Sequence, residues 1–333
     1  MILTRTPLRI SLGGGGTDLP FYCQKFGASL VYGAINKYMY ITVSRRLQKD
    51  IKLNYSKTEV VDRVDAIEHP LIKEALKHVG IPNDIEIHSV SDIPSGTGLG
   101  SSSAFLVGLL NALYYSRGVK LSSYELAEIA SSILMDRLGE PCGKQDQYAS
   151  SFGNICHLHI DPSGKTTITP VRIMHDVLAR LEANLVLFYT GFTRNASEVL
   201  LSQKEAAEHS RPDAGEQYAC FHEIKRIGEE SLKCLESGDL TRFGEYMDEH
   251  WQLKKRTTGL MTNDRLDSYY ELARSKGALG GKIVGAGGGG FLMLYIEAGH
   301  DGLREIMRAK GLIEVPFKFD FEGTRVVYDG NNY

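Results

Sequence analysis

Three clusters of glycine constrain the fold of this chain more than any other feature. They are GGGGTDLP at residues 13–20, SGTGLG at residues 95–100 and GAGGGG at residues 285–290. Glycine has no Cβ, so it permits positive φ angles and lets a ligand or a second backbone approach closely. The 35 glycines among 333 residues exceed the usual share of about 7%. Because many of them are clustered, they indicate tight loops and binding sites rather than linkers.

The second cluster leads into a predicted helix. Three serines follow it, and then apolar residues recur at helical spacing at Phe105, Leu106, Leu109, Leu110 and Leu113. A helix that begins at residues 101–103 leaves its first N–H groups unpaired, and with its dipole this makes an anion site. The segment therefore predicts phosphate binding, with a serine-capped helix after a flexible turn as the alternative. It is not a Walker A loop, because Gly100 is followed by Ser101 and not by lysine.

The first and third clusters favour different roles. Asp18 follows flexible backbone and would accept hydrogen bonds from the hydroxyls of a polyol, unless it only forms a turn before Pro20. Gly285, Gly287 and Gly290 have the spacing of a dinucleotide-binding loop. The strand-like FLMLYI follows them, however, whereas that motif opens a helix. We therefore expect the third cluster to be a tight loop packed against a nearby site.

A fourth segment, GEPCGKQDQYAS at residues 139–150, is dense in hydrogen-bonding groups. Asp146 within it has the chemistry of a general base for a sugar hydroxyl. The alternative is a solvated loop carboxylate.

Composition excludes several classes of function. The formal net charge is −3, without the basic footprint of a nucleic-acid binder. The five cysteines include no CxxC pair, so zinc and redox motifs lack support. Arg5 and Arg9 interrupt the apolar N-terminus, and no apolar run reaches about 18 residues, so we expect neither a signal peptide nor a membrane span. A cytoplasmic protein is the default expectation.

The order of predicted elements indicates an α+β protein. Residues 1–175 form a β-rich half, in which residues 29–46 are expected as strands broken at Gly33. Ser122 and Glu125 have the spacing of a capping box at the start of a helix. Residues 176–333 form the second half, with three or four helices between residues 196 and 276 and strands expected at EVPFKFDF and TRVVYD.

Four motifs together resemble those of the GHMP kinases, the galacto-, homoserine, mevalonate and phosphomevalonate kinases. They are TPLRISLGGGGTD, PSGTGLGSSSA, CGKQDQ and KIVGAGGGGF, in the family's order. The resemblance implies an N-terminal domain like the second domain of ribosomal protein S5. It also implies a C-terminal α+β, ferredoxin-like domain, with ATP and the acceptor in the cleft between the two.

The resemblance also implies roles for individual residues. It places Asp146 and Arg9 at the reaction centre and implies that Ser102 and Asp136 hold Mg²⁺, with Glu140 as a substitute for the shorter Asp136. The residues that it assigns to the ATP phosphate loop are Pro94, Ser95, Gly96, Thr97, Gly98, Leu99, Gly100, Ser101, Ser102 and Ser103. The residues predicted to contact the acceptor are Thr17, Asp18, Lys144, Gln145, Arg194, Gly287 and Gly288.

Within the family, the match is greatest to kinases that phosphorylate the anomeric hydroxyl of a heptose 7-phosphate to give the 1,7-bisphosphate. ATP and Mg²⁺ are the implied cofactors, and a sugar phosphate is the implied partner. Lys144 and Arg194 are the candidates for binding the acceptor's phosphate. The alternatives are a fucokinase-like or galactokinase-like enzyme and a non-catalytic regulator that binds sugar or nucleotide.

Overall fold

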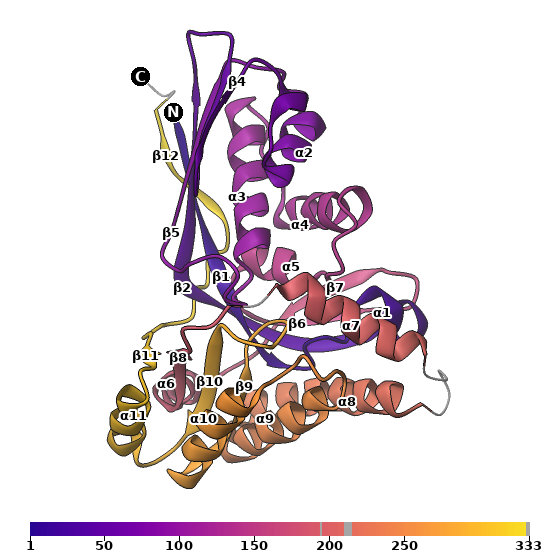
Figure 1. The fold of residues 1–333 in the computed structure, drawn as a ribbon, viewed down its shortest axis with the longest axis vertical. Helices are drawn as coiled ribbons and strands as arrows, with labels where there is room; N and C mark the ends of the chain where they lie inside the picture. The colour runs from indigo at the N-terminus through magenta and orange to yellow at the C-terminus, as the bar shows by residue number, and fades with distance from the viewer. Residues whose placement is uncertain (194, 210–214, 331–333) are drawn as a thin grey trace.

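The computed structural model describes residues 1–193, 195–209 and 215–330, which form two sheets with their helices (Figure 1). The first sheet has eight strands, in the order β12-β1-β2-β5-β3-β4, with β6 paired to β2 and β7 paired to β6. Its strands are β1 (Ile2–Gly13), β2 (Ala28–Arg45), β3 (Ile51–Asn54), β4 (Thr58–Val61), β5 (Ile85–Ser91), β6 (Ile155–Ile160), β7 (Thr166–Pro170) and β12 (Arg325–Asp329).

The expectation that Gly33 breaks a strand is wrong, because β2 continues through it. Gly33 pairs with Ile10 of β1 and with Ile155 of β6. A Cβ on Gly33 would lie 2.3 Å from a ring carbon of Phe319. The glycine therefore makes room for an aromatic ring that packs on the strand.

Helices of the first half cover one face of this sheet, where Figure 1 shows α2, α3 and α4 together. The helical segments are α1 (Pro20–Phe26), η1 (Val64–Ala66), α2 (Pro70–Val79), α3 (Ser101–Ser116), α4 (Ser123–Ser132), η2 (Ile133–Arg137) and α5 (Gln145–Phe152). The predicted helix after the second glycine cluster is confirmed as α3, and the capping box of Ser122 and Glu125 is present on α4. The latter helix ends in the π-helical turn η2.

The second sheet has four antiparallel strands in the order β11-β8-β10-β9. These are β8 (Leu185–Tyr189), β9 (Ala278–Ile283), β10 (Phe291–Ile296) and β11 (Ile313–Glu314). The helices around it are α6 (His175–Asn184), α7 (Ala196–Glu208), α8 (Glu216–Ser237), α9 (Leu240–Lys255), α10 (Asp264–Ser275) and α11 (His300–Ala309). Chain order and strand order are those of a ferredoxin-like β-α-β-β-α-β unit with extra helices in its first crossover.

EVPFKFDF was predicted to be a strand, but only its first residue lies in β11. The segment then runs along β2, where Phe319 makes an isolated bridge to Ile35. The backbone N–H of Asn36 donates to the carbonyl of Lys318, 2.8 Å away. The segment therefore follows the first sheet without joining it as a regular strand.

The chain then returns to the first sheet, where β12 pairs antiparallel with β1 and Ile2 faces Asp329. Figure 1 shows this last strand beside the first. The division at residues 175 and 176 remains a prediction; β8–β11 all follow it, while β12 belongs to the first sheet.

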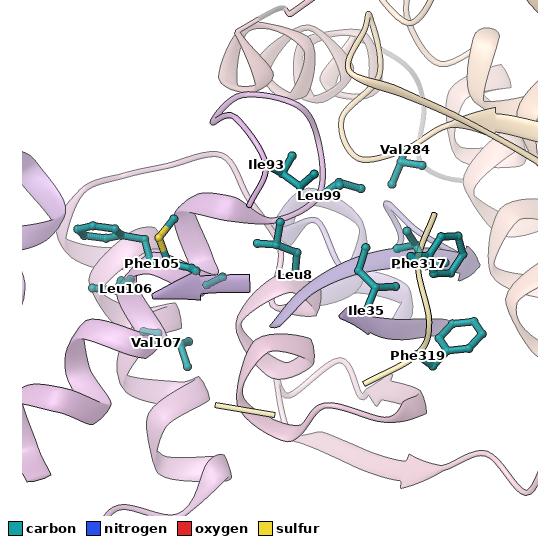
Figure 2. Close-up of a cluster of buried hydrophobic side chains, with 14 of the residues drawn as sticks. Leu8, Ile35, Ile93, Leu99, Phe105, Leu106, Val107, Val284, Phe317 and Phe319 are labelled. Atoms are coloured by element: carbon teal, nitrogen blue, oxygen red, sulfur yellow. The ribbon is translucent and has the colours of Figure 1, made fainter. Parts of the chain in front are cut away.

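One apolar core connects the two halves. Figure 2 shows Leu8, Ile35 and Leu99 of the first half in the same cluster as Val284 and Phe317. Leu99 belongs to the second glycine cluster and Val284 directly precedes the third, so the shared core anchors both loops. No helix in the described ranges is long and apolar enough to span a membrane.

Candidate active site

The second and third glycine clusters pack backbone against backbone. A Cβ on Gly98 would lie 2.3 Å from the carbonyl oxygen of Val284, and one on Gly285 would lie 2.5 Å from that of Gly98. A Cβ on Gly290 would lie 2.1 Å from the carbonyl oxygen of Thr97. The expectation of a tight loop against a nearby site is confirmed, and β10 follows this loop as predicted.

The second cluster ends where α3 begins. Gly100 caps the helix with φ 79°, and no side chain accepts a hydrogen bond from the first turn there. The predicted phosphate-loop residues that line a cavity are Gly96, Gly98, Gly100, Ser101, Ser102 and Ser103. Of the predicted loop residues outside that lining, Thr97 Oγ1 donates to the carbonyl of Pro94 at 2.9 Å, and Leu99 is fully buried in the core. Pro94 and Ser95 are exposed.

Arg9 and Asp146 form a two-pronged ion pair at this loop. Arg9 Nε and Nη2 donate to the two carboxylate oxygens of Asp146, each at 2.6 Å. Arg9 Nη1 donates to the carbonyl of Gly98, also at 2.6 Å. The pair therefore ties the first residues of α5 to β1 and to the phosphate loop, which brings together two residues that the sequence predicted at one reaction centre.

The first glycine cluster forms a turn that positions Asp18 in the cavity. Thr17 is buried, and its hydroxyl donates to the carbonyl of Gly14 at 2.8 Å, so it holds the turn. Asp18 Oδ2 accepts a hydrogen bond from the backbone N–H of Gln145 at 2.9 Å, while Gly143 passes so close that a Cβ there would lie 2.1 Å from the same oxygen. Burial raises the pKa of Asp18, and the nearby Asp146 adds to that rise.

The cavity between these loops has a volume of about 660 Å³ and is lined by both halves of the chain. Glu140 lines it, whereas Asp136 lies on the exposed side of η2 outside the lining. Across the described residues, no group of three or more His, Cys, Asp or Glu side chains is arranged to hold a metal ion.

The predicted acceptor contacts lie in different places. Gln145 lines the cavity, but Lys144 Nζ bonds both carboxylate oxygens of Glu128, at 2.8 and 2.9 Å, and does not line it. Gly287 and Gly288 pack on Met261 outside the lining. Arg194 lies outside the described residues.

Sequence reasoning missed three basic side chains in the cavity wall: His250, Lys254 and Lys282. Lys282 stands three residues before the third glycine cluster, which was the one available sign. His250 and Lys254 have the spacing of one helix face, but this spacing is equally typical of a charged, solvated face.

The loops and the cavity agree with comparisons to known proteins. The family model described as the GHMP kinases N-terminal domain matches residues 66–154, and the model of the GHMP kinases C-terminal domain matches residues 231–311. A D-glycero-alpha-D-manno-heptose 7-phosphate kinase of Campylobacter jejuni is 29% identical over 97% of this chain and 98% of its own length. A galactokinase of Thermococcus kodakarensis is 25% identical over 88% of this chain and 89% of its own length.

Solved structures share the whole fold. The crystal structure of a D-glycero-D-manno-heptose 1-phosphate kinase from Bacteroides thetaiotaomicron superposes with a TM-score of 0.79, at 25% identity, and covers 99% of this chain and 100% of that one. A Lactococcus lactis galactokinase complexed with galactose superposes with a TM-score of 0.76 at 19% identity, covering 97% of this chain and 94% of that one, which supports the fold alone.

Proposed function

Because this chain belongs to the GHMP kinases, we propose that it transfers the γ-phosphate of ATP to the anomeric hydroxyl of a heptose 7-phosphate. The product is the 1,7-bisphosphate, a precursor of nucleotide-activated heptose for surface polysaccharide. The observation that carries the proposal is the Arg9–Asp146 pair beside the phosphate loop, in a chain whose likeness to a heptose 7-phosphate kinase is nearly full-length.

The nucleotide is expected at the α3 end of the cavity. The unpaired N–H groups at residues 100–103 and the helix dipole suit the β- and γ-phosphates. An apolar wall formed by Leu71, Leu134 and Leu138 lies in the same cavity and suits the flat adenine ring. With the nucleotide bound in this way, the γ-phosphate would lie near Asp146, whose Oδ2 is 3.2 Å from the position of a Cβ on Gly100.

Phosphoryl transfer requires positioning and neutralisation of charge more than covalent chemistry. Each oxygen of Asp146 that accepts from Arg9 has a further lone pair, so the carboxylate can also bind an acceptor hydroxyl. Asp146 would orient that hydroxyl or accept its proton. Arg9 holds the carboxylate in place and offsets its charge, and Asp18 would bind other hydroxyls of the sugar.

Mg²⁺ bound with ATP supplies charge neutralisation at the transferred phosphate. Mg²⁺ usually takes one or two protein ligands, with phosphate oxygens and water completing its shell. Ser102 and Glu140 both line the cavity, so these residues fit the ion better than Asp136, which does not. We therefore propose Ser102 and Glu140 as its protein ligands.

The test measures the release of ADP from MgATP in the presence of one sugar at a time. The sugars are the heptose 7-phosphate, the unphosphorylated heptose, galactose and fucose. The proposal expects the heptose 7-phosphate to give the highest kcat/KM and a product phosphorylated at the anomeric carbon by NMR. A clear preference for galactose or fucose would assign the chain to another acceptor. No ADP with any sugar, at concentrations where sugar binding is measured, would support the non-catalytic alternative.

A further inference from the structure

Three basic side chains are buried in the cavity wall. His250 and Lys254 come from α9, Lys282 comes from β9, and their exposed fractions are 1%, 7% and 2%. All three line the cavity that also contains Asp146. Lysine is almost never buried this deeply unless it is paired, so the cluster needs an explanation.

Partners among the described residues match only part of the cluster's positive charge, because Asp18 and Asp146 attract Lys254 without forming an ion pair with it. Lys254 Nζ donates to the carbonyl of Gly285, and Lys282 Nζ lies 3.2 Å from His250 Nδ1. Within the described ranges, neither ammonium forms an ion pair with a carboxylate. The hydroxyl of Ser11, a buried residue that lines the same cavity, has no hydrogen-bond partner among these residues, and His250 Nε2 has none beyond the nearby backbone of Gly15.

The electrostatics of the cluster favour an anionic ligand. Burial lowers the pKa of Lys254 to about 8 and lowers the pKa of Lys282 and of His250 well below their ordinary values. Mutual repulsion adds to this effect, since Lys254 and Lys282 each lower the pKa of His250. A buried anion within hydrogen-bond reach would oppose the effects of burial and of mutual repulsion on these pKa values, because it would stabilise the charged forms.

The cluster extends from the reaction centre to the first glycine cluster. Arg9 and Ser11 are two residues apart on β1 and share one face of the strand, and His250 and Lys254 share one face of α9, about 6 Å apart along its axis. Arg9, at one end, is bonded to Asp146, and a hydrogen bond with the backbone of Gly15 contributes to the pKa of His250 at the other. The cluster is therefore more extended than a site that binds a single hydroxyl group.

Gly15 passes close to Ser11 and lines the same cavity. A Cβ on Gly15 would lie 2.3 Å from Ser11 Oγ and 3.5 Å from Gln145 Oε1, so any side chain there would displace the Ser11 hydroxyl. The cavity wall here thus combines the unpartnered hydroxyl of Ser11 with the imidazole of His250 and the amines of Lys254 and Lys282. This donor set matches a phosphate monoester, which has three acceptor oxygens and is a dianion at neutral pH.

We propose that Lys282, His250 and Ser11, with Lys254 between them and Asp146, bind the phosphate that the acceptor already carries. The proposal rests on the proposed function, since it assigns the 7-phosphate of that acceptor to one subsite. In the proposal, these residues take the role of phosphate ligand that the sequence had suggested for Lys144, which is paired with Glu128 and does not line the cavity. The phosphate loop remains the site for the nucleotide.

The first experiment compares Lys282→Met with wild type on the heptose 7-phosphate and on the unphosphorylated heptose. Loss of a charge-assisted contact should lower kcat/KM for the phosphorylated acceptor by about 10- to 100-fold. The KM for ATP and the turnover of the free heptose should change by less than about threefold on the same scale. Ser11→Ala, which removes a hydroxyl that has no partner in the described structure, should show a smaller loss in the same direction.

The matched control is Lys255→Met. Lys255 follows Lys254 on α9, but its Nζ lies 3.5 Å from Oδ1 of Asp267 and it does not line the cavity. Lys255→Met should therefore leave the preference for the phosphorylated acceptor unchanged. If Lys282→Met and Ser11→Ala keep the wild-type preference, the subsite is wrong while the proposed function stands. If Lys282→Met mainly raises the KM for ATP, the cluster serves the nucleotide and the proposal fails.

A second experiment separates the subsite from the proposed acceptor. Inorganic phosphate is titrated calorimetrically into the enzyme without ATP, at pH 8, in two buffers of different ionisation enthalpy. The subsite predicts binding with uptake of protons, reduced in Lys282→Met and unchanged in Lys255→Met. If wild type does not distinguish the two heptoses, the proposed acceptor is wrong, and this titration alone decides whether an anion site exists. Equal binding by wild type and Lys282→Met would overturn the subsite.

Discussion

The phosphate loop and the basic cluster are both parts of one cavity, but they are built differently. The loop, residues 96–103, presents backbone N–H groups and glycines from one continuous segment. The cluster consists of side chains from α9 and β9. Lys254 and Lys282 are 28 positions apart in the sequence, with α10 between them. A site made from backbone leaves its pattern in a short stretch of sequence, and a site made from side chains on distant elements does not.

Asp146 lies between the two regions, and its loss should have the largest effect. Asp146→Asn keeps the shape of the side chain but removes its charge and one acceptor. Turnover should fall by about 10²–10⁴-fold, the usual contribution of a general base, while ATP and the sugar phosphate still bind. Steady-state turnover and calorimetric binding check this. Near-normal turnover in Asp146→Asn would mean that the carboxylate only braces Arg9.

The loop can be broken through its backbone contacts. Gly98→Ala places a methyl group 2.3 Å from the carbonyl of Val284 at a φ of 85°, so the contact with the third glycine cluster must open. We expect a loss of stability of about 1–3 kcal/mol and a raised KM for ATP. Gly96→Ala is the matched control, because its φ of 73° is equally positive but no atom lies within 4 Å of the added Cβ.

Denaturant unfolding and the KM for ATP should separate the two variants. Both variants place an alanine at a positive φ, which costs free energy. Only Gly98→Ala also brings its methyl group into contact with the carbonyl of Val284. Equal effects in both variants would mean that the packing of the two loops contributes nothing beyond backbone strain.

The cluster should respond to pH, unlike the loop. Lys254 faces Arg9 and Lys282, which are cations, and Asp18 and Asp146, which are anions, and its pKa is lowered to about 8 chiefly by burial. Above that value the folded, ligand-free protein releases a proton that the unfolded chain keeps up to the ordinary lysine pKa of 10.5, so stability should rise with pH across this range.

Binding of the sugar phosphate should show the opposite trend. It needs the charged ammonium, so its KM should rise above pH 8, by at most about tenfold per pH unit. Lys254→Arg keeps its charge at every accessible pH and should flatten the profile. A rise in KM that is identical in Lys254→Arg would assign the titration to another group.

The smallest effect is expected at Lys144. Its ammonium is bonded to Glu128 and does not line the cavity, so Lys144→Met should change the preference for a phosphorylated acceptor by less than about twofold. The pair is partly exposed, and its loss should cost at most about 1 kcal/mol of stability. Acceptor kinetics and thermal unfolding measure the two. A tenfold loss of preference would restore Lys144 as a phosphate ligand.

Local sequence was sufficient where one element explains the feature. The start of α3, the capping box on α4 and the tight third loop were all predicted from neighbouring residues, and Arg9 and Asp146 were brought together by a family resemblance. The break at Gly33 was predicted wrongly because Phe319, which fills the space above it, lies 286 positions later. His250 and Lys254 were missed because helix spacing does not tell which face is buried.

The pairing of β12 with β1 has a consequence for synthesis of the chain. β1 leaves the ribosome long before its partner on one edge, because Arg5 pairs with Arg325, which lies 320 positions later in the chain. Until then that edge of β1 offers unpaired N–H and C=O groups to any other strand, which is a hazard for aggregation. A nascent chain stopped at residue 311 would expose this edge.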